Sequence, residues 1–201
     1  MKIERNSRQV PKTSEITANS KYFDILYAHL QVISEWDQVD GHFRRIPRKE
    51  INFTKLGKTL GLSRQTIAKK FNNLITLGLV IEVEGDYELP ILKDSIAFLL
   101  PYDTLRILTN TLNEKTISVY TYLINRFYAN NCKEFQVTYT QLKAFCGVGT
   151  KTRSNDYIIA DILTILKKLE LIDYDIRGIQ VETGNFKDCI FITQVSNKIK
   201  C

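Results

Sequence analysis

Two short helical patterns separated by a glycine-ended turn are the feature that most constrains how this chain can fold. Phe53, Leu56 and Leu60 recur at helical spacing, and Gly61 follows where a left-handed helix end is needed. After Leu62, Ser63 can cap a second helix that ends at Gly78. The apolar face of this second helix is formed by Ile67, Phe71, Leu74 and Ile75. The sequence therefore predicts two helices joined by a tight turn.

The flanking segments complete a recognisable order of elements. After Gly78 the apolar period changes from 3.6 to 2 residues, and Gly85 interrupts the alternation, which predicts a tight two-stranded hairpin ended by Pro90. Upstream, apolar spacing predicts a helix at residues 22–39, which Asp40 and Gly41 end. In the basic run 42–51, Pro47 disfavours a long helix, and a short strand is expected there. The predicted order is helix, short strand, helix, turn, helix and hairpin.

The second half of the chain repeats this order. Thr138 and Gln141 form a capping-box signature that opens a brief helix ending at Cys146. The other predicted elements are a helix at residues 113–128, a strand at 135–137, a helix at 157–169, and a hairpin of residues 171–176 and 180–194 with Gly184 and Asn185 at its tip. Two structural repeats of about 90 residues are therefore expected.

We expect an α+β chain, mainly α, with two such domains in tandem. The polar segment 1–20 is predicted to be a flexible arm. The predicted domains are residues 21–90 and 113–201. Segment 91–112 is rich in apolar residues that would be costly to leave in water, so it is predicted to be a packed linker between the domains.

Positive charge is concentrated in one window of the first domain. The whole chain carries a net charge of +6, whereas residues 42–73 contain nine Lys or Arg residues and a single acid, Glu50, a net charge of +8. A solvated charged surface is the simpler interpretation. A surface with one acid among nine bases differs from the mixed charge usual on such surfaces, and this favours an anion-binding face.

The turn itself matches a known pattern. Residues 60–67 read LGLSRQTI, small Gly57 lies four residues before Gly61, and Ile67 lies six residues after it. Over about residues 22–90 the chain resembles winged-helix DNA-binding proteins, which contain a helix-turn-helix core. The resemblance implies that the helix after Ser63 enters the major groove of double-stranded DNA with its first residues at base edges.

Side-chain positions on that helix agree with this implication. With its apolar face buried, Gln65, Lys69, Asn72 and Thr76 point the opposite way, and such groups can bond adenine or guanine edges. Ser63 and the helix N-terminus can hold a phosphate. For each residue singly, a polar solvent face is the alternative. The predicted DNA-binding residues are Arg44, Arg45, Arg48, Lys49, Lys55, Lys58, Ser63, Arg64, Gln65, Thr66, Lys69, Lys70, Asn73, Lys151 and Arg153.

The first hairpin departs from the family pattern because it is acidic. Glu82, Glu84, Asp86 and Glu88 alternate along it, which would place several carboxylates on one side, where phosphates repel them. We therefore expect this hairpin to stay out of the minor groove and to face basic groups of a partner subunit or of the second domain. The backbone clamp is then predicted to be formed by Arg44, Arg45, Arg48 and Lys49.

The second domain is a poorer candidate for reading DNA. Its corresponding helix carries Asp156 and Asp161, which oppose phosphates, although Lys151 and Arg153 in the preceding turn still allow phosphate contact. An architectural or dimer-forming role is favoured over sequence reading for this half.

Two winged helices joined by a packed linker resemble the initiators that bind replication origins of plasmids and phages. The resemblance implies sequence-specific binding of double-stranded DNA and recruitment of a helicase or its loader, with a homodimer as a further expectation. A winged-helix transcriptional regulator is the main alternative. A tandem winged-helix interaction scaffold is the third, and the basic window argues against it because such scaffolds are typically acidic.

Catalytic and metal-binding motifs are lacking, so no enzyme activity, cofactor or metal is expected. The four cysteines form no C-x-x-C pair and only His29 and His42 could join them, which favours reduced cytoplasmic thiols over disulfides or zinc. The longest stretch free of charged side chains, residues 71–81, has eleven residues and is too short to span a membrane. Residues 1–20 lack the apolar region of an export signal.

Overall fold

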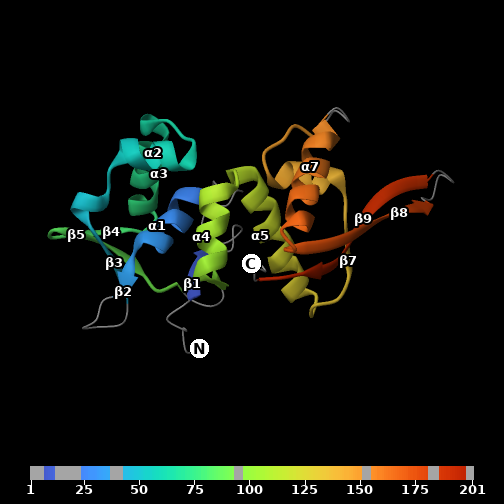
Figure 1. The fold of residues 1–201 in the computed structure, drawn as a ribbon, viewed down its shortest axis with the longest axis horizontal. Helices are drawn as coiled ribbons and strands as arrows, with labels where there is room; N and C mark the ends of the chain where they lie inside the picture. Colours follow the sequence, from blue (N-terminus) through green and yellow to red (C-terminus); the bar gives the residue numbers. More distant parts are fainter. Residues whose placement is uncertain are drawn as a thin grey trace. The chain divides into compact units, whose positions relative to one another are not determined.

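The computed structural model describes residues 7–11, 24–36, 43–92, 97–150, 155–180 and 186–197. These residues form seven α-helices and three small antiparallel sheets, so the predicted α+β class is confirmed at this level (Figure 1). The chain divides into two compact units, Met1–Glu114 and Lys115–Cys201. The division falls two residues after the predicted start of the second domain.

The first unit contains a four-stranded sheet in the order β2-β3-β5-β4 and a separate two-stranded sheet of β1 and β6. In Figure 1, α2 and α3 lie together above the strands β3, β4 and β5. The elements are β1 (Ser7–Pro11), α1 (Ile25–Ile33), β2 (Glu35–Trp36), β3 (Phe43–Pro47), a 3₁₀ turn (Arg48–Glu50), α2 (Phe53–Leu60), α3 (Arg64–Thr76), β4 (Ile81–Val83), β5 (Asp86–Pro90), β6 (Ala97–Pro101) and α4 (Tyr102–Thr111).

Helix α1 is shorter than the helix predicted within residues 22–39. The Asp24 carboxylate caps its start by accepting hydrogen bonds from the backbone N–H groups of Leu26 and Tyr27, at 2.9 and 3.1 Å. Ser34 adopts extended backbone angles at the other end, and β2 follows directly. The apolar spacing of the sequence continued past Ser34, but strand pairing of Glu35 with Arg45 ends the helix there.

A single apolar core joins α1 and α3 to the sheet of the first unit. Ile67, Phe71 and Leu74 on α3 are buried against Leu26 and Leu30 of α1 and further residues of this core. The ring of Phe71 meets Tyr87 of β5 edge-on, with ring centroids 5.0 Å apart. Because α3 is held by this inner face, its opposite face is left to solvent.

The N-terminal segment and the predicted linker both belong to the first unit. Residues 7–11, predicted to lie in a flexible arm, instead form β1, which pairs antiparallel with β6, so that prediction is wrong for these residues. The Gln9 side chain exchanges two hydrogen bonds of 2.8 Å with the backbone of Leu92. Arg8 Nε donates to the Gln31 carbonyl oxygen of α1 at 2.9 Å. The described elements of segment 91–112, β6 and α4, therefore pack within this unit, with α4 against α1.

The second unit has the element order predicted for it. Its elements are α5 (Glu114–Ala129), which begins at the last residue of the first unit, β7 (Phe135–Val137), α6 (Tyr139–Phe145), α7 (Asp156–Lys168), β8 (Ile172–Gln180) and β9 (Phe186–Val195). The predicted capping box is confirmed, since Thr138 and Gln141 make both of its hydrogen bonds. The strands pair in the order β7-β9-β8. The predicted hairpin tip at Gly184 and Asn185 lies outside the described residues.

Candidate nucleic-acid interface

Glycine is needed at two positions for the turn between α2 and α3, Gly57 and Gly61. Gly61 ends α2 with a φ of 65°, the left-handed conformation predicted for it. A Cβ atom on Gly57 would lie only 2.6 Å from the carbonyl oxygen of Leu62, so helix and turn touch where a side chain would not fit. The Leu62 N–H donates to the Gly57 carbonyl at 2.9 Å across the same contact. This close approach sets the position of α3 against α2.

Ser63 caps α3, as predicted. Its hydroxyl oxygen accepts a hydrogen bond from the Thr66 N–H at 3.1 Å and lies 2.9 Å from the Thr66 hydroxyl. Both residues are exposed, as are Arg64 and Gln65 between them. The positive end of the helix dipole is thus presented to solvent beside an arginine, an arrangement suited to an anion.

The outward face of α3 is polar and carries no acid. Ile67, Phe71 and Leu74 are buried, and the residues between them turn outward. No Asp or Glu occurs anywhere in residues 51–81, which include the whole of α2 and α3. The exposed side chains of α3 up to its last turn are Arg64, Gln65, Thr66, Lys69, Asn72, Asn73 and Thr76.

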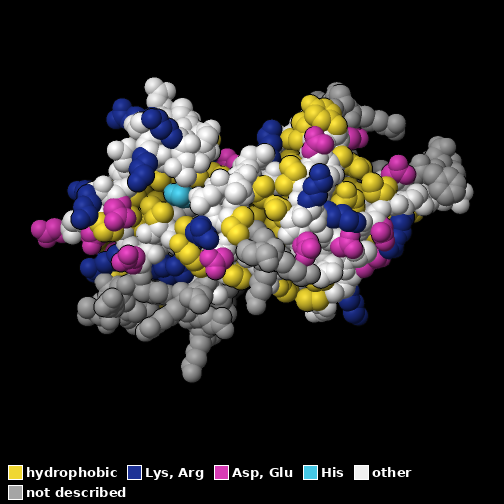
Figure 2. Space-filling model, in the orientation of Figure 1, with side chains coloured by type: hydrophobic (Ala, Val, Ile, Leu, Met, Phe, Trp, Pro, Cys, Tyr) yellow, Lys and Arg dark blue, Asp and Glu magenta, His cyan; other side chains and the backbone are white. Residues whose placement is uncertain are grey.

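Five of the nine cations in the basic window, residues 42–73, are exposed and make no ion pair with a described residue. In the part of the chain that the structure describes, none of them has an ion-pair partner. They are Lys49, Lys55, Lys58, Arg64 and Lys69. Figure 2 shows several Lys and Arg side chains on the surface over α2. These cations and the polar face of α3 come from one continuous run of sequence.

Arg44 does not join this surface. Its side chain points to the helix side of β3 and the residue is only 5% exposed. Its guanidinium donates to the hydroxyl and carbonyl oxygens of Ser34, at 2.8 and 2.6 Å. Burial, with Arg8 nearby, lowers the Arg44 pKa to about 10. Arg44 therefore links β3 to the end of α1, and its buried guanidinium is not placed to contact phosphates as predicted.

Arg45 and Arg48 are engaged by the acidic hairpin. Arg45 lies directly opposite Glu88 in the strand register and pairs with it at 3.2 Å. Arg48 pairs with Glu82, and its guanidinium lies 5.5 Å from the centre of the Tyr87 ring. Three of the four hairpin carboxylates, Glu82, Asp86 and Glu88, thus pair with cations of the first unit itself. Their charge also offsets two of the predicted clamp residues.

Lys70 is likewise held by ion pairs within the first unit. Its ammonium group pairs with Glu114 at 2.7 Å and with Asp24, the cap of α1, at 3.6 Å. Burial alone would lower the Lys70 pKa, but the two carboxylates raise it above the ordinary value. Lys70 points away from the solvent face of α3 and is therefore not part of the candidate interface.

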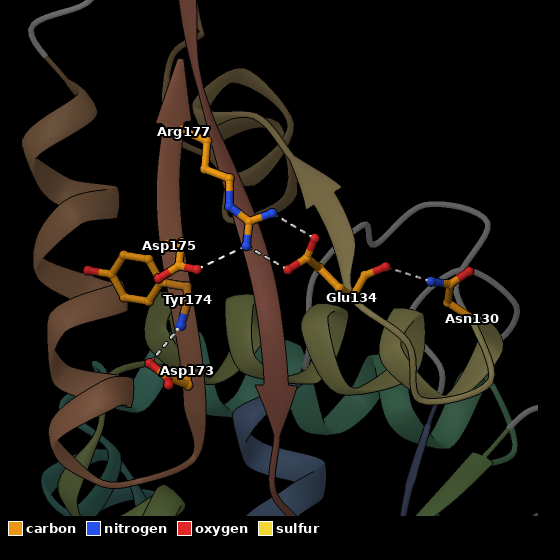
Figure 3. Close-up of polar contacts among 6 residues, drawn as sticks. All are labelled: Asn130, Glu134, Asp173, Tyr174, Asp175 and Arg177. Carbon is orange, nitrogen blue, oxygen red and sulfur yellow. Dashed lines mark hydrogen bonds and ion pairs between the residues drawn. The ribbon is translucent and has the colours of Figure 1, made fainter. Parts of the chain in front are cut away.

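In the described part of the second unit, one exposed cation is held in a network of ion pairs. Lys151 and Arg153 lie outside the described residues. Arg177 of β8 makes a two-pronged ion pair with Glu134, at 2.9 and 2.8 Å, and a third contact with Asp175 at 3.0 Å (Figure 3). Its guanidinium also covers the ring of Phe191 at 4.5 Å. Nothing in the local sequence indicated this network, because it depends on the spatial meeting of β8 with the segment before β7.

No family model, curated protein or solved structure matches the chain. Among the described residues, no cluster of three or more His, Cys, Asp or Glu side chains could hold a metal ion. The helices in these same ranges are all too short or too polar to cross a membrane.

Proposed function

We propose that the first unit is a winged-helix domain that binds double-stranded DNA with α3 in the major groove, and that the second unit is a second winged helix. The second unit runs helix, strand, helix, helix, strand, strand, and the same order is made in the first unit by α1, β3, α2, α3, β4 and β5, with β1, β2, β6 and α4 added to it. The corresponding strands pair in the same order, β3-β5-β4 in the first unit and β7-β9-β8 in the second. This shared order supports a tandem arrangement of one fold.

The observation that carries the DNA-binding proposal is the acid-free solvent face of α2 and α3. Gln65 and Lys69 lie on the outward side of the first turns of α3, the part of a recognition helix that meets base edges. Lys55 and Lys58 lie on α2, the helix that crosses the phosphate backbone in this docking geometry. The surface therefore offers base-reading groups flanked by phosphate-binding ones.

The hairpin of β4 and β5 has no part in this proposal. Arg45 and Arg48 are neutralised by carboxylates of the same sheet, so the hairpin presents no excess of positive charge to a minor groove. Phosphate contact is assigned instead to Lys49, Lys55, Lys58 and Arg64.

A selection from a random duplex pool, followed by titration of the selected site and a scrambled one, tests sequence-specific binding. Gln65→Ala and Lys69→Ala are each expected to cost about 1 to 3 kcal/mol of binding free energy on the selected site. Each variant is also expected to have a smaller ratio of affinity for the selected duplex over the scrambled duplex. Asn110→Ala, an exposed substitution on α4, is the matched control and is expected to change neither affinity. Equal affinity of the wild type for both duplexes would refute specific binding.

As the biological role we propose initiation of replication at a plasmid or phage origin, with a helicase or its loader as the recruited partner. The tandem repetition of the element order favours this over a transcriptional regulator, in which a ligand or oligomerisation domain usually replaces the second winged helix. Selection from genomic DNA separates the two. Repeated sites beside an origin support initiation, whereas a single operator beside a promoter supports regulation of transcription.

A further inference from the structure

Helix α7 occupies in the second unit the place that α3 occupies in the first, yet it exposes a different kind of face. Tyr157 is 64% exposed and Ile165 is 38% exposed. Asp161, Thr164 and Lys168 are also exposed, and the spacing of all five at three and four residues puts them on one stripe. Figure 2 shows hydrophobic side chains on the surface over α7. We call these five residues the α7 stripe.

The stripe carries one acid and one base, and both are available. Within the described ranges neither Asp161 nor Lys168 has an ion-pair partner. The neighbouring charges of α7 are committed, since Asp156 pairs with Lys143 at 2.6 Å and Lys167 with Asp173 at 2.6 Å. The uncommitted acid lies near the middle of the helix and the uncommitted base in its last turn.

We propose that the α7 stripe is the interface of a homodimer in which α7 packs antiparallel against α7 of a second copy. With the twofold axis between Thr164 and Ile165, Asp161 of each copy lies opposite Lys168 of the other. Ile165 of each copy lies at the centre, beside Thr164 of the other. Tyr157 of each copy lies at the level of residue 172 of the other, beyond the end of its α7, and so borders the contact. The stripe is thus complementary in charge to itself, and only in the antiparallel direction.

A duplex is a poorer occupant of this face than a second copy. Asp161 would stand among phosphates, and the two exposed apolar side chains, Tyr157 and Ile165, would gain little from a polar groove. The pairing of stripes requires no DNA, so this inference does not rest on the function proposed for the first unit.

The size of the stripe sets the strength of the dimer. About this axis, residues 161–168 of the two helices overlap, eight residues or about 12 Å of helix. A single helix pair of that length buries less than the roughly 800 Å² per partner of a standard stable interface. The dimer is therefore expected to dissociate in the micromolar range rather than to be permanent.

Sedimentation equilibrium of the full chain over a roughly hundredfold concentration range tests the proposal, using charge reversals on the stripe. Asp161→Lys and Lys168→Asp each put like charges opposite each other twice, and each is expected to raise the dimer dissociation constant roughly tenfold. The double variant restores both pairs and is expected to dimerise like the wild type. An equimolar mixture of the two single variants is expected to form the heterodimer for the same reason.

Lys133→Asp, a reversal at an exposed residue of the same unit off the stripe, is the matched control and is expected to leave the dissociation constant unchanged. Circular dichroism checks that every variant is folded. A wild type that stays monomeric throughout would overturn the proposal. So would single reversals that weaken the dimer no more than the control, or a double variant that fails to regain it.

Discussion

Replacing Gly57 by Ala should destabilise the first unit, although in an ordinary helix the same change is stabilising. An Ala in place of Gly in a solvent-facing helix interior gains about 1 kcal/mol. At Gly57 the new methyl group would lie 2.6 Å from the Leu62 carbonyl oxygen. The oxygen is a backbone atom and the methyl carbon is bonded directly to the backbone, so neither can move aside by a side-chain rotation. Relieving this contact costs about 1 to 3 kcal/mol as overpacking. It also strains the 2.9 Å hydrogen bond from Leu62 to Gly57, worth about 1 kcal/mol.

The balance is a loss of roughly 1 to 3 kcal/mol in the free energy of unfolding, measured by urea denaturation with circular dichroism. Thr59→Ala, an exposed change in the same helix, is the control and is expected to be neutral or slightly stabilising. Gly61→Ala separates the effect of a steric contact from that of backbone strain. Nothing lies within 4 Å of the Cβ added at Gly61, so only its positive φ opposes the change. A Gly57→Ala variant as stable as wild type would refute the close contact of α2 with the turn.

Two further predictions concern buried ionisable groups of the first unit. Lys70→Met should lower the free energy of unfolding by about 1.5 kcal/mol, because it leaves the partly buried Glu114 and Asp24 without their cation; Lys69→Met, on the solvent face, should not. Burial lowers the pKa of His29 below its ordinary value of 6.5. The unfolded chain therefore binds this proton first, and stability should fall as the pH drops below about 6.5. His29→Asn should flatten that dependence between pH 7.5 and 5.5 in urea titrations, and an unchanged slope would contradict the assignment.

Local signals in the sequence were sufficient to predict the elements that carry the candidate interface. The glycine at the end of α2, the cap at Ser63 and the apolar spacing of α3 act within a few residues of one another, so they are legible in one stretch of chain. The capping box at Thr138 is of the same kind. The strand order of the three sheets was not predicted, because it depends on pairing between distant segments.

The burial and ion pairs of individual charged side chains could not be predicted from the sequence. Arg44 and Arg45 are neighbours in a basic run, but the strand's alternation buries one and pairs the other with Glu88, 43 residues further on. Lys70 and Glu114 meet across a similar separation. The strand β1 was missed because its partner β6 lies about 90 residues away and its own composition is polar. Charge density along the sequence therefore overstated the number of exposed cations without an ion pair.

The central claim, that DNA is bound by the free cations of α2 and α3 and not by those of the acidic hairpin, is tested most directly by the salt dependence of duplex affinity. For the Lys55→Ala, Lys58→Ala double variant, the log–log slope should fall by about 1.8, so that the loss of affinity from 50 to 200 mM salt is roughly twelvefold smaller than for wild type. The Arg45→Ala, Arg48→Ala double variant should keep the wild-type slope. A slope that is unchanged in the lysine variant, or flattened equally in the arginine variant, would contradict the account.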